Sequence, residues 1–296
     1  MQALVLGAAA GGGFPQWNCG CANCVRARAG DPASPARTQA SIALTAGQGW
    51  LLVGASPDLR QQILANPDLA PPPGTRASPI AAVVLVSADI DGIAGLLTLR
   101  EQHAFTVYAP APILKVLANN SIFASLDPSL VTRVEIAPGQ VVDTGIGLAL
   151  TLLAMPGKIP LYEEDRAAAA AEPAVTYAAR VQSGARICIV APACARIDDA
   201  VLAQLHDATT IFFDGTLFHD REMIDAGLSA KTGQRMGHVS VSGPDGALSR
   251  LAGLPARKIF FHINNSNPIL LADSPERKIV DNSGFQVAHD GMRVTP

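Results

Sequence analysis

Three cysteines lie close together near the start of the chain, at Cys19, Cys21 and Cys24. Thiolates at this spacing in a glycine-containing loop can converge on one tetrahedral ion at roughly 2.3 Å, which is typical of zinc. A closed zinc site needs a fourth ligand that the spacing does not identify, and the alternative is three unrelated loop cysteines. We expect a structural zinc loop at about residues 17–26, which would hold an otherwise unsupported N-terminal segment.

Acidic and imidazole side chains follow three aliphatic or aromatic runs. Asp89 and Asp91 come after one run, Asp214 ends a second, and His262 ends a third. Carboxylates and imidazoles at strand ends can meet at one edge of a sheet and bind a metal there. For the Asp89–Asp91 segment an ordinary Asp-Gly turn before a helix is the alternative. His238 follows a glycine in a loop, where an imidazole would project either as a ligand or without a function.

Other chemistries have weaker support in the sequence. No G-x-S-x-G string marks a serine nucleophile. The glycine-rich stretch at residues 7–13 matches neither the dinucleotide-binding pattern nor the P-loop, and it contains no basic residue that could meet a phosphate. Cys188 and Cys194 are better explained as core residues than as ligands.

The elements that must position these residues can be read from hydrophobic periodicity. Strands are expected at Gln2–Leu6, Ser41–Leu44, Trp50–Val53, Ala82–Val86, Phe105–Tyr108, Leu148–Leu153, Val175–Val181, Arg186–Val190, Thr210–Phe213 and Lys258–His262. Helices are expected at Pro57–Ala65, Ile93–Glu101, Pro112–Ala118, Asp198–Asp207, Asp220–Ala226, Pro244–Ala252 and Pro275–Val280. The order is not a regular βα alternation. It predicts an α/β protein in which two mixed sheets pack face to face with helices outside, an αβ/βα four-layer sandwich.

Composition limits the class of protein. Of the 296 residues, 49% are hydrophobic and 16% charged, so the chain has enough apolar surface to fold. The net charge is −3 and no basic cluster stands out, which argues against nucleic acid as a partner. No apolar run approaches the roughly 20 residues that cross a bilayer, so membrane insertion is not expected. We expect one domain over residues 1–296, with the alanine run 167–171 as a surface connection, in the cytoplasm.

The chain also resembles a known family, the coenzyme pyrroloquinoline quinone (PQQ) synthesis protein B family, a distant branch of the metallo-β-lactamase superfamily. The resemblance runs nearly end to end. It is carried by AAGGGFPQWNC at 9–19, RTQASIA at 37–43, ASPDLR at 55–60, GLLTLRE at 95–101, KTGQRMGH at 231–238 and HINNSNPIL at 262–270. Long polar strings of this kind are far more specific than a short motif. The fold that the resemblance implies is that of a metallo-hydrolase, with two mixed β-sheets and outer helices.

The resemblance also implies a set of metal ligands. The superfamily's H-x-H-x-D-H motif falls on Ser87, Asp89, Asp91 and Gly92, so Asp91 alone matches it. The family typically lacks the first two histidines but tends to keep the last, where this chain has Gly92. The implied inventory is therefore Asp91, Asp214, His238 and His262, with His238 and Asp91 also acting in catalysis.

Two imidazoles with one or two carboxylates suit a mononuclear non-haem iron(II) centre better than a two-metal hydrolase. The resemblance accordingly implies an iron- and oxygen-dependent hydroxylase that acts on the tyrosine ring of a Glu-Tyr-derived precursor in PQQ biosynthesis. Other divalent metals could substitute for iron. One alternative is a non-catalytic carrier of PQQ or a precursor that aids transport to the periplasm. A further alternative is a metal-dependent phosphodiesterase-like hydrolase.

The cysteine loop is similar to the C-x-C-x-x-C structural zinc site of part of this superfamily, which is associated in the resembling family with dimer formation. In some related phosphodiesterases the fourth ligand is a histidine three residues after the last motif histidine. Asn265 occupies that position here and is a poor zinc ligand. The fourth ligand thus stays unassigned. The implied partners are a small peptide or amino-acid-derived PQQ precursor, other proteins of the pathway and a second copy of the chain.

Overall fold

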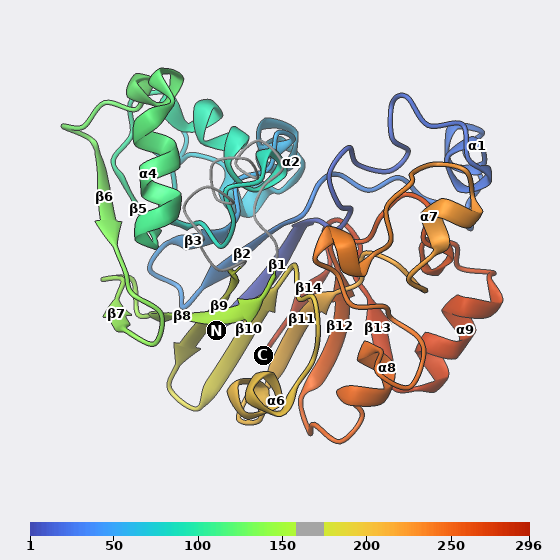
Figure 1. The fold of residues 1–296 in the computed structure, drawn as a ribbon. Helices are drawn as coiled ribbons and strands as arrows, with labels where there is room; N and C mark the ends of the chain where they lie inside the picture. The colour runs from blue at the N-terminus through green and yellow to red at the C-terminus, as the bar shows by residue number, and fades with distance from the viewer. Residues whose placement is uncertain (158–174) are drawn as a thin grey trace.

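The computed structural model describes residues 1–157 and 175–296, which form two mixed β-sheets with helices on their outer faces (Figure 1). The predicted four-layer αβ/βα sandwich is confirmed. The first sheet has the strand order β14 (Arg293–Val294), β1 (Gln2–Gly7), β2 (Ser41–Thr45), β3 (Trp50–Val53), β4 (Ile80–Val84), β5 (Phe105–Ala109), β6 (Val131–Glu135). The second has the order β13 (Phe285–Val287), β12 (Arg257–Phe261), β11 (Thr210–Asp214), β10 (Arg186–Ala191), β9 (Val175–Ser183), β8 (Ala149–Pro156), β7 (Val141–Asp143).

The helices cover the two outer faces. On the first sheet lie α2 (Leu59–Ala65), α3 (Ile90–Ile93), α4 (Ala111–Asn119) and the 3₁₀ turns Pro67–Leu69, Ala94–Arg100 and Ser121–Ser125. With the second sheet are α6 (Asp199–Leu205), α7 (Glu222–Asp225), α8 (Ala247–Arg250), α9 (Pro275–Asn282) and the 3₁₀ turns Gln234–Met236 and Pro268–Leu270. The helix α1 (Ala22–Arg28) follows the N-terminal loop.

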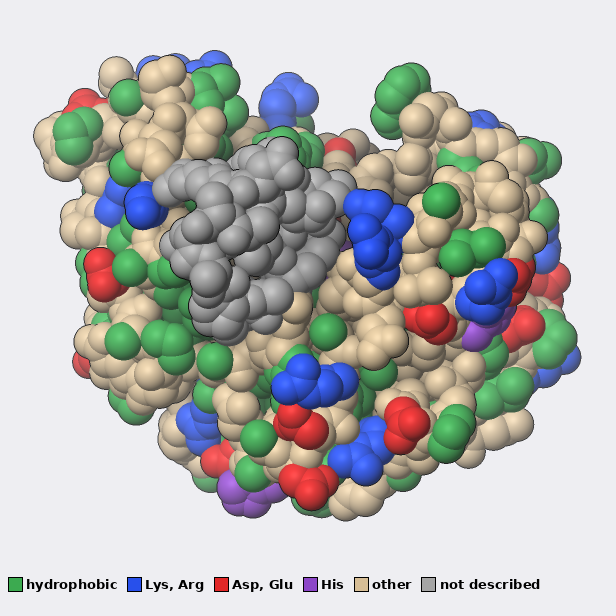
Figure 2. All heavy atoms as spheres, in the orientation of Figure 1, with side chains coloured by type: hydrophobic (Ala, Val, Ile, Leu, Met, Phe, Trp, Pro, Cys, Tyr) green, Lys and Arg blue, Asp and Glu red, His purple; other side chains and the backbone are tan. Residues whose placement is uncertain are grey.

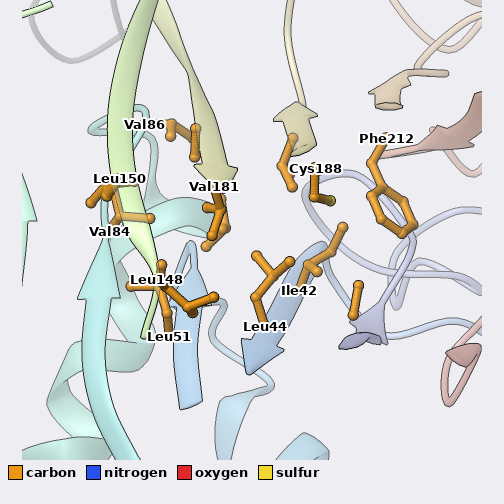
Figure 3. Close-up of a cluster of buried hydrophobic side chains, with 14 of the residues drawn as sticks. Ile42, Leu44, Leu51, Val84, Val86, Leu148, Leu150, Val181, Cys188 and Phe212 are labelled. Atoms are coloured by element: carbon orange, nitrogen blue, oxygen red, sulfur yellow. The ribbon is translucent and has the colours of Figure 1, made fainter. Parts of the chain in front are cut away.

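The central strands are apolar on both faces because both faces are covered. In β11, Phe212 points into the core between the two sheets, whereas Ile211 and Phe213 pack under the outer helices. Figure 3 shows the inter-sheet core, where Leu51 and Ile42 of the first sheet lie near Leu148 and Cys188 of the second. A rigid double layer of this kind fixes the strand ends that carry the acidic and imidazole side chains.

Several predicted element boundaries are wrong. The helix expected at Ile93–Glu101 is a short α3 followed by a 3₁₀ segment. Gly95 is pressed against the backbone there, since a Cβ at this residue would lie 2.1 Å from the carbonyl oxygen of Ser56. The helix expected at Pro244–Ala252 is confined to α8, and that expected at Asp220–Ala226 to α7.

The sequence interpretation also missed elements. Strands β6 and β7 were not predicted because they are partly exposed edge strands with little apolar pattern, and β13 and β14 have at most three residues. Helix α1 lies within the proposed cysteine loop, so Cys24 is helical rather than in a turn. The alanine run 167–171 is outside the described residues. No helix in the described part of the chain is long and apolar enough to span a bilayer.

Candidate metal centres

A cavity of about 730 Å³ opens at the carboxyl ends of β4, β11 and β12, where both sheets meet the loops that follow them. Its walls are largely apolar, with side chains such as Val86, Ile113 and Phe261. Its polar lining includes Asp91, His238 and His262 among others. A concave, mostly apolar cavity with a few convergent polar groups is the usual form of a small-molecule site.

The structure brings Asp214, His238 and His262 together, with one possible ligand atom of each within 4.8 Å of the others. Asp214 ends β11 and is fully buried, and His262 directly follows the neighbouring parallel strand β12. The His238 Nδ1–H donates to Asp214 Oδ2 at 2.8 Å, and the two imidazole rings stack with centroids 5.4 Å apart. Two imidazoles and one carboxylate therefore meet beside the cavity, which both histidines line and from which the buried Asp214 is set back.

Thr216 Oγ1 lies at the centre of this cluster. It donates to Asp214 Oδ1 at 2.7 Å and lies 3.1 Å from His238 Nδ1 and 2.9 Å from His262 Nδ1. Contacts at Nδ1 fix the orientation of each imidazole and leave Nε2 as the nitrogen that can bind a metal. The sequence reasoning did not assign a role to Thr216. Its position two residues after a strand-end aspartate was the available signal.

Asp91 lies on the other side of His262, with its Oδ2 3.2 Å from His262 Nε2. Burial disfavours the charged form of Asp91, but the hydrogen bond with His262 outweighs this and holds the pKa of the carboxyl below its usual value. Burial likewise disfavours the charged imidazole, and the contact with Asp91 raises the pKa of His262 above its usual value. Both shifts favour an ion pair of the protonated imidazole with the carboxylate, at a place where a nitrogen and an oxygen are close enough to bind one cation.

His262 itself has an unusual backbone. Its φ of 57° is in the left-handed region, which non-glycine residues seldom adopt. Thr216 Oγ1 is also 3.0 Å from the His262 carbonyl oxygen, so the same side chain contacts the ring and the backbone of this residue. Strain of this kind is commonly found at functional sites.

The other motif positions line the cavity as well. Ser87, Asp89 and Gly92 are part of its wall. A Cβ placed on Gly92 would meet Ser87 Oγ at 3.1 Å and no backbone atom closer than 3.6 Å. Position 92 therefore faces the cavity and has room for a side chain after a small movement of the serine hydroxyl.

The three thiols of Cys19, Cys21 and Cys24 also converge, with their sulfurs within 4.8 Å of one another. Asn265 caps them. Its side-chain nitrogen lies 3.1 Å from the sulfur of Cys19, 3.6 Å from that of Cys21 and 3.4 Å from that of Cys24. The side chain of Asn265 thus occupies the fourth direction that the sequence interpretation left unassigned.

The environment of the thiols fits a bound cation. Burial raises the pKa of the Cys24 thiol to about 11. The Cys19 thiol is also partly buried, but hydrogen bonds to its sulfur, among them one from the backbone N–H of Cys21, outweigh this burial and lower the pKa of Cys19. Buried thiols in contact become thiolates readily when a metal ion neutralises them. The three sulfurs therefore suit zinc as ligands, whereas the Asn265 amide nitrogen donates hydrogen bonds to them and supplies no fourth donor atom.

Comparison with known proteins decides the family. The model of the β-lactamase superfamily domain matches residues 49–263. A coenzyme PQQ synthesis protein B from Gluconacetobacter diazotrophicus is 50% identical, with 99% of this chain and 98% of the relative covered, and one from a Methylobacterium strain is 47% identical over the full length of both chains. The chain belongs to the coenzyme PQQ synthesis protein B family.

Solved structures agree with this assignment. The zinc-bound family member PqqB from Methylobacterium extorquens superposes with a TM-score of 0.96 at 43% identity, and each chain is covered completely. A diphosphatase of the PhnP family superposes with a TM-score of 0.67 at 20% identity, covering 100% of this chain and 97% of the other, which shows a shared fold.

Proposed function

We propose that the protein acts in PQQ biosynthesis, where it hydroxylates the tyrosine ring of a Glu-Tyr-derived precursor at an iron(II) centre. The observation that carries this proposal is the cluster of two imidazoles with one buried carboxylate beside an apolar-walled cavity, in a chain of this family. His238 and His262 would hold the metal through Nε2, together with Asp91, whereas Asp214, predicted as a ligand, accepts from Cys194, Thr216 and His238 and would orient His238 from its Nδ1 side. Two histidines and one carboxylate are the usual ligands of non-haem iron(II) enzymes that use oxygen.

The residues of the cavity support this chemistry. Iron(II) in this position would supply the dioxygen chemistry that adds a hydroxyl group to a phenol, with two electrons from an external reductant reducing the second oxygen atom to water. Asp91 and His238 line the cavity and can touch the substrate. The carboxylate of Asp91 has two oxygens, so that one would bind the metal and the other would accept the proton that leaves the ring.

Zinc is the proposed ion of the cysteine cluster, held by Cys19, Cys21 and Cys24 and capped by Asn265. Support comes from the converging sulfurs and from the zinc-bound relative. Binding at this position would attach the N-terminal loop to the segment after β12.

We also propose that the protein forms a homodimer, contacts other proteins of the pathway and is located in the cytoplasm. On the face in Figure 2, cationic and anionic side chains are interspersed among the described residues, which agrees with a small-molecule substrate.

The test is a single-turnover assay. Protein reconstituted with iron(II) without oxygen, then given Glu-Tyr, a reductant and oxygen, should form a dihydroxyphenylalanine product. His262→Ala should lose this activity, since it removes one of the proposed ligands. His219→Ala is the matched control and should keep it, because the His219 side chain is half exposed, pairs with Asp225 at 4.0 Å and does not line the cavity.

Failure of the assay would be informative. Fully iron-loaded protein that forms no product would contradict the hydroxylase proposal. Tight binding of PQQ without turnover would then favour a carrier, and hydrolysis of a phosphodiester with manganese would favour the hydrolase.

A further inference from the structure

The segment after His262 contains an asparagine whose orientation is fixed by a chain of hydrogen bonds. Asn264 lines the cavity and is 8% exposed. Its side-chain nitrogen donates to Ser266 Oγ at 2.6 Å, and Ser266 Oγ donates to Glu222 Oε1, also at 2.6 Å. The chain ends at Glu222, which is 6% exposed.

The direction of this chain follows from the chemistry of its members. The second oxygen of Glu222 accepts from the Phe218 backbone N–H at 2.7 Å, and a carboxylate only accepts. The single proton of the Ser266 hydroxyl must therefore go to Glu222 Oε1. Ser266 Oγ can then only accept from Asn264, which turns the amide nitrogen toward Ser266 and its Oδ1 away from it.

Asn264 Oδ1 is consequently a fixed acceptor in the cavity. No described residue donates to this oxygen, and the backbone of Asn264 is held by its N–H donating to the Thr216 carbonyl oxygen at 3.0 Å. Asn264 follows His262 by two residues, so the acceptor lies at the metal end of the cavity. A preorganised acceptor in a largely apolar wall selects a ligand that carries a hydrogen-bond donor, because a ligand without one leaves the oxygen unpaired.

We propose that Asn264 is a specificity-determining residue that accepts a hydrogen bond from the ring hydroxyl of a phenolic substrate, with Ser266 and Glu222 as the residues that position it. This rests on the proposed function for the identity of the ring. It adds the reason why the site would discriminate a tyrosine ring from a phenylalanine ring.

The experiment compares two dipeptides, Glu-Tyr and Glu-Phe, by titration calorimetry on the full-length zinc-loaded protein, which binds without oxidising either. Wild type should prefer Glu-Tyr by about tenfold, the usual value of one hydrogen bond to a buried group. Asn264→Leu should abolish the preference. Glu222→Gln should abolish or reverse it, because a glutamine amide can donate to Ser266 and so reverse the chain and flip the Asn264 amide.

Control variants separate an effect on the orientation of the Asn264 amide from a general structural defect. A purely structural defect would weaken the binding of both dipeptides alike, whereas the proposal predicts a change in their ratio. Asp290→Asn is the matched control, a partly buried carboxylate that accepts from Ala8 and Thr38 outside this cavity, and it should keep the wild-type ratio. Should Glu222→Gln fail to fold, Ser266→Ala cuts the chain at its middle and should likewise reduce the preference.

The inference is overturned if wild type binds both dipeptides equally, binds neither, or if Asn264→Leu keeps the preference. These outcomes are distinct from failure of the proposed function. Selective binding that depends on Asn264 would stand even if iron-loaded protein made no hydroxylated product, and product formation would stand even if Glu-Phe bound as well as Glu-Tyr.

Discussion

At the scale of single residues, one hydroxyl group organises the proposed active site. Thr216 contacts the carboxylate of Asp214 and the rings of His238 and His262, and it is 5% exposed. Partners of this kind behind metal ligands orient the ligand atoms, and their removal typically lowers metal affinity by about 10–100-fold. Thr216 is thus a positioning residue of the site.

Thr216→Val tests this role, since it removes the hydroxyl and nearly conserves the volume. We expect the free energy of unfolding to fall by about 1–3 kcal/mol, because buried polar groups lose a partner. We also expect weaker binding of metal at the active site. Denaturant unfolding and metal titration measure the two effects. Unchanged metal affinity would show that the hydroxyl does not orient the histidines.

Gly92 gives a second prediction at this scale. Gly92→His places an imidazole at a cavity-facing position, and Ser87 Oγ, 3.1 Å from the added Cβ, can rotate away. The affinity for iron(II) should rise by at least about tenfold, because even residues that only hydrogen-bond to a metal ligand change metal affinity by that much. Gly92→Ala is the control for the backbone and should leave the affinity unchanged. Equal affinity of wild type and Gly92→His would mean that position 92 does not face the ion.

At the scale of elements, one short segment joins the two proposed metal centres. His262 contributes to the active-site cluster, and Asn265 caps the three thiols. Between the two centres, the side-chain nitrogen of Asn23 on α1 donates to the carbonyl oxygens of Asn265, Ser266 and Asn267. The residues at 262–267 are therefore held from both sides, and the cysteine cluster stabilises the segment that carries the active-site histidine.

Loss of zinc should loosen this segment. In Cys21→Ser we expect about one zinc ion less per chain and faster hydrogen exchange at residues 14–28 and 262–267. A ligand at about 100 times its Kd stabilises by about 2.7 kcal/mol, which corresponds to roughly 4–5 °C in Tm for a chain of this size. Chelator treatment should affect wild type but add little to the variant. A variant with wild-type zinc content would exclude the cysteines as ligands.

At the scale of the whole molecule, the core between the two sheets holds the strand ends in register. Phe212 is fully buried there, in the strand that ends at Asp214, and its ring lies edge-on to that of Phe261 with centroids 6.3 Å apart. Both phenylalanines precede residues of the proposed active site. The packing of these two rings between the sheets thus fixes the ends of β11 and β12, where Asp214 and His262 lie.

Phe212→Ala should leave a cavity in this core and lower the free energy of unfolding by about 3–5 kcal/mol. Val141→Ala is the contrasting control: Val141 is 69% exposed, and the change should stay within about 0.5 kcal/mol. Denaturant unfolding of both variants measures the difference. A similar small loss in both would show that the inter-sheet core can collapse around the missing ring.

The sequence predicted the layers and the strand ends better than the contacts within the site. Runs such as Ile211–Phe213 are apolar throughout because both faces are buried, so their ends, and with them Asp214 and His262, could be located. Edge strand β6 could not be, since its alternate residues face solvent. The roles of Thr216, Asn264 and Glu222 depend on which atoms meet across loops, and that information is not present in spacing.

Anaerobic iron(II) titration of the zinc-containing protein, followed by metal analysis, determines whether the two histidines bind iron. Wild type should take up one iron per chain in addition to the zinc of the cysteine cluster. A His238→Ala, His262→Ala double variant should bind none and keep the zinc. The account is contradicted if the double variant binds as much iron as wild type, or if wild type binds no iron at all.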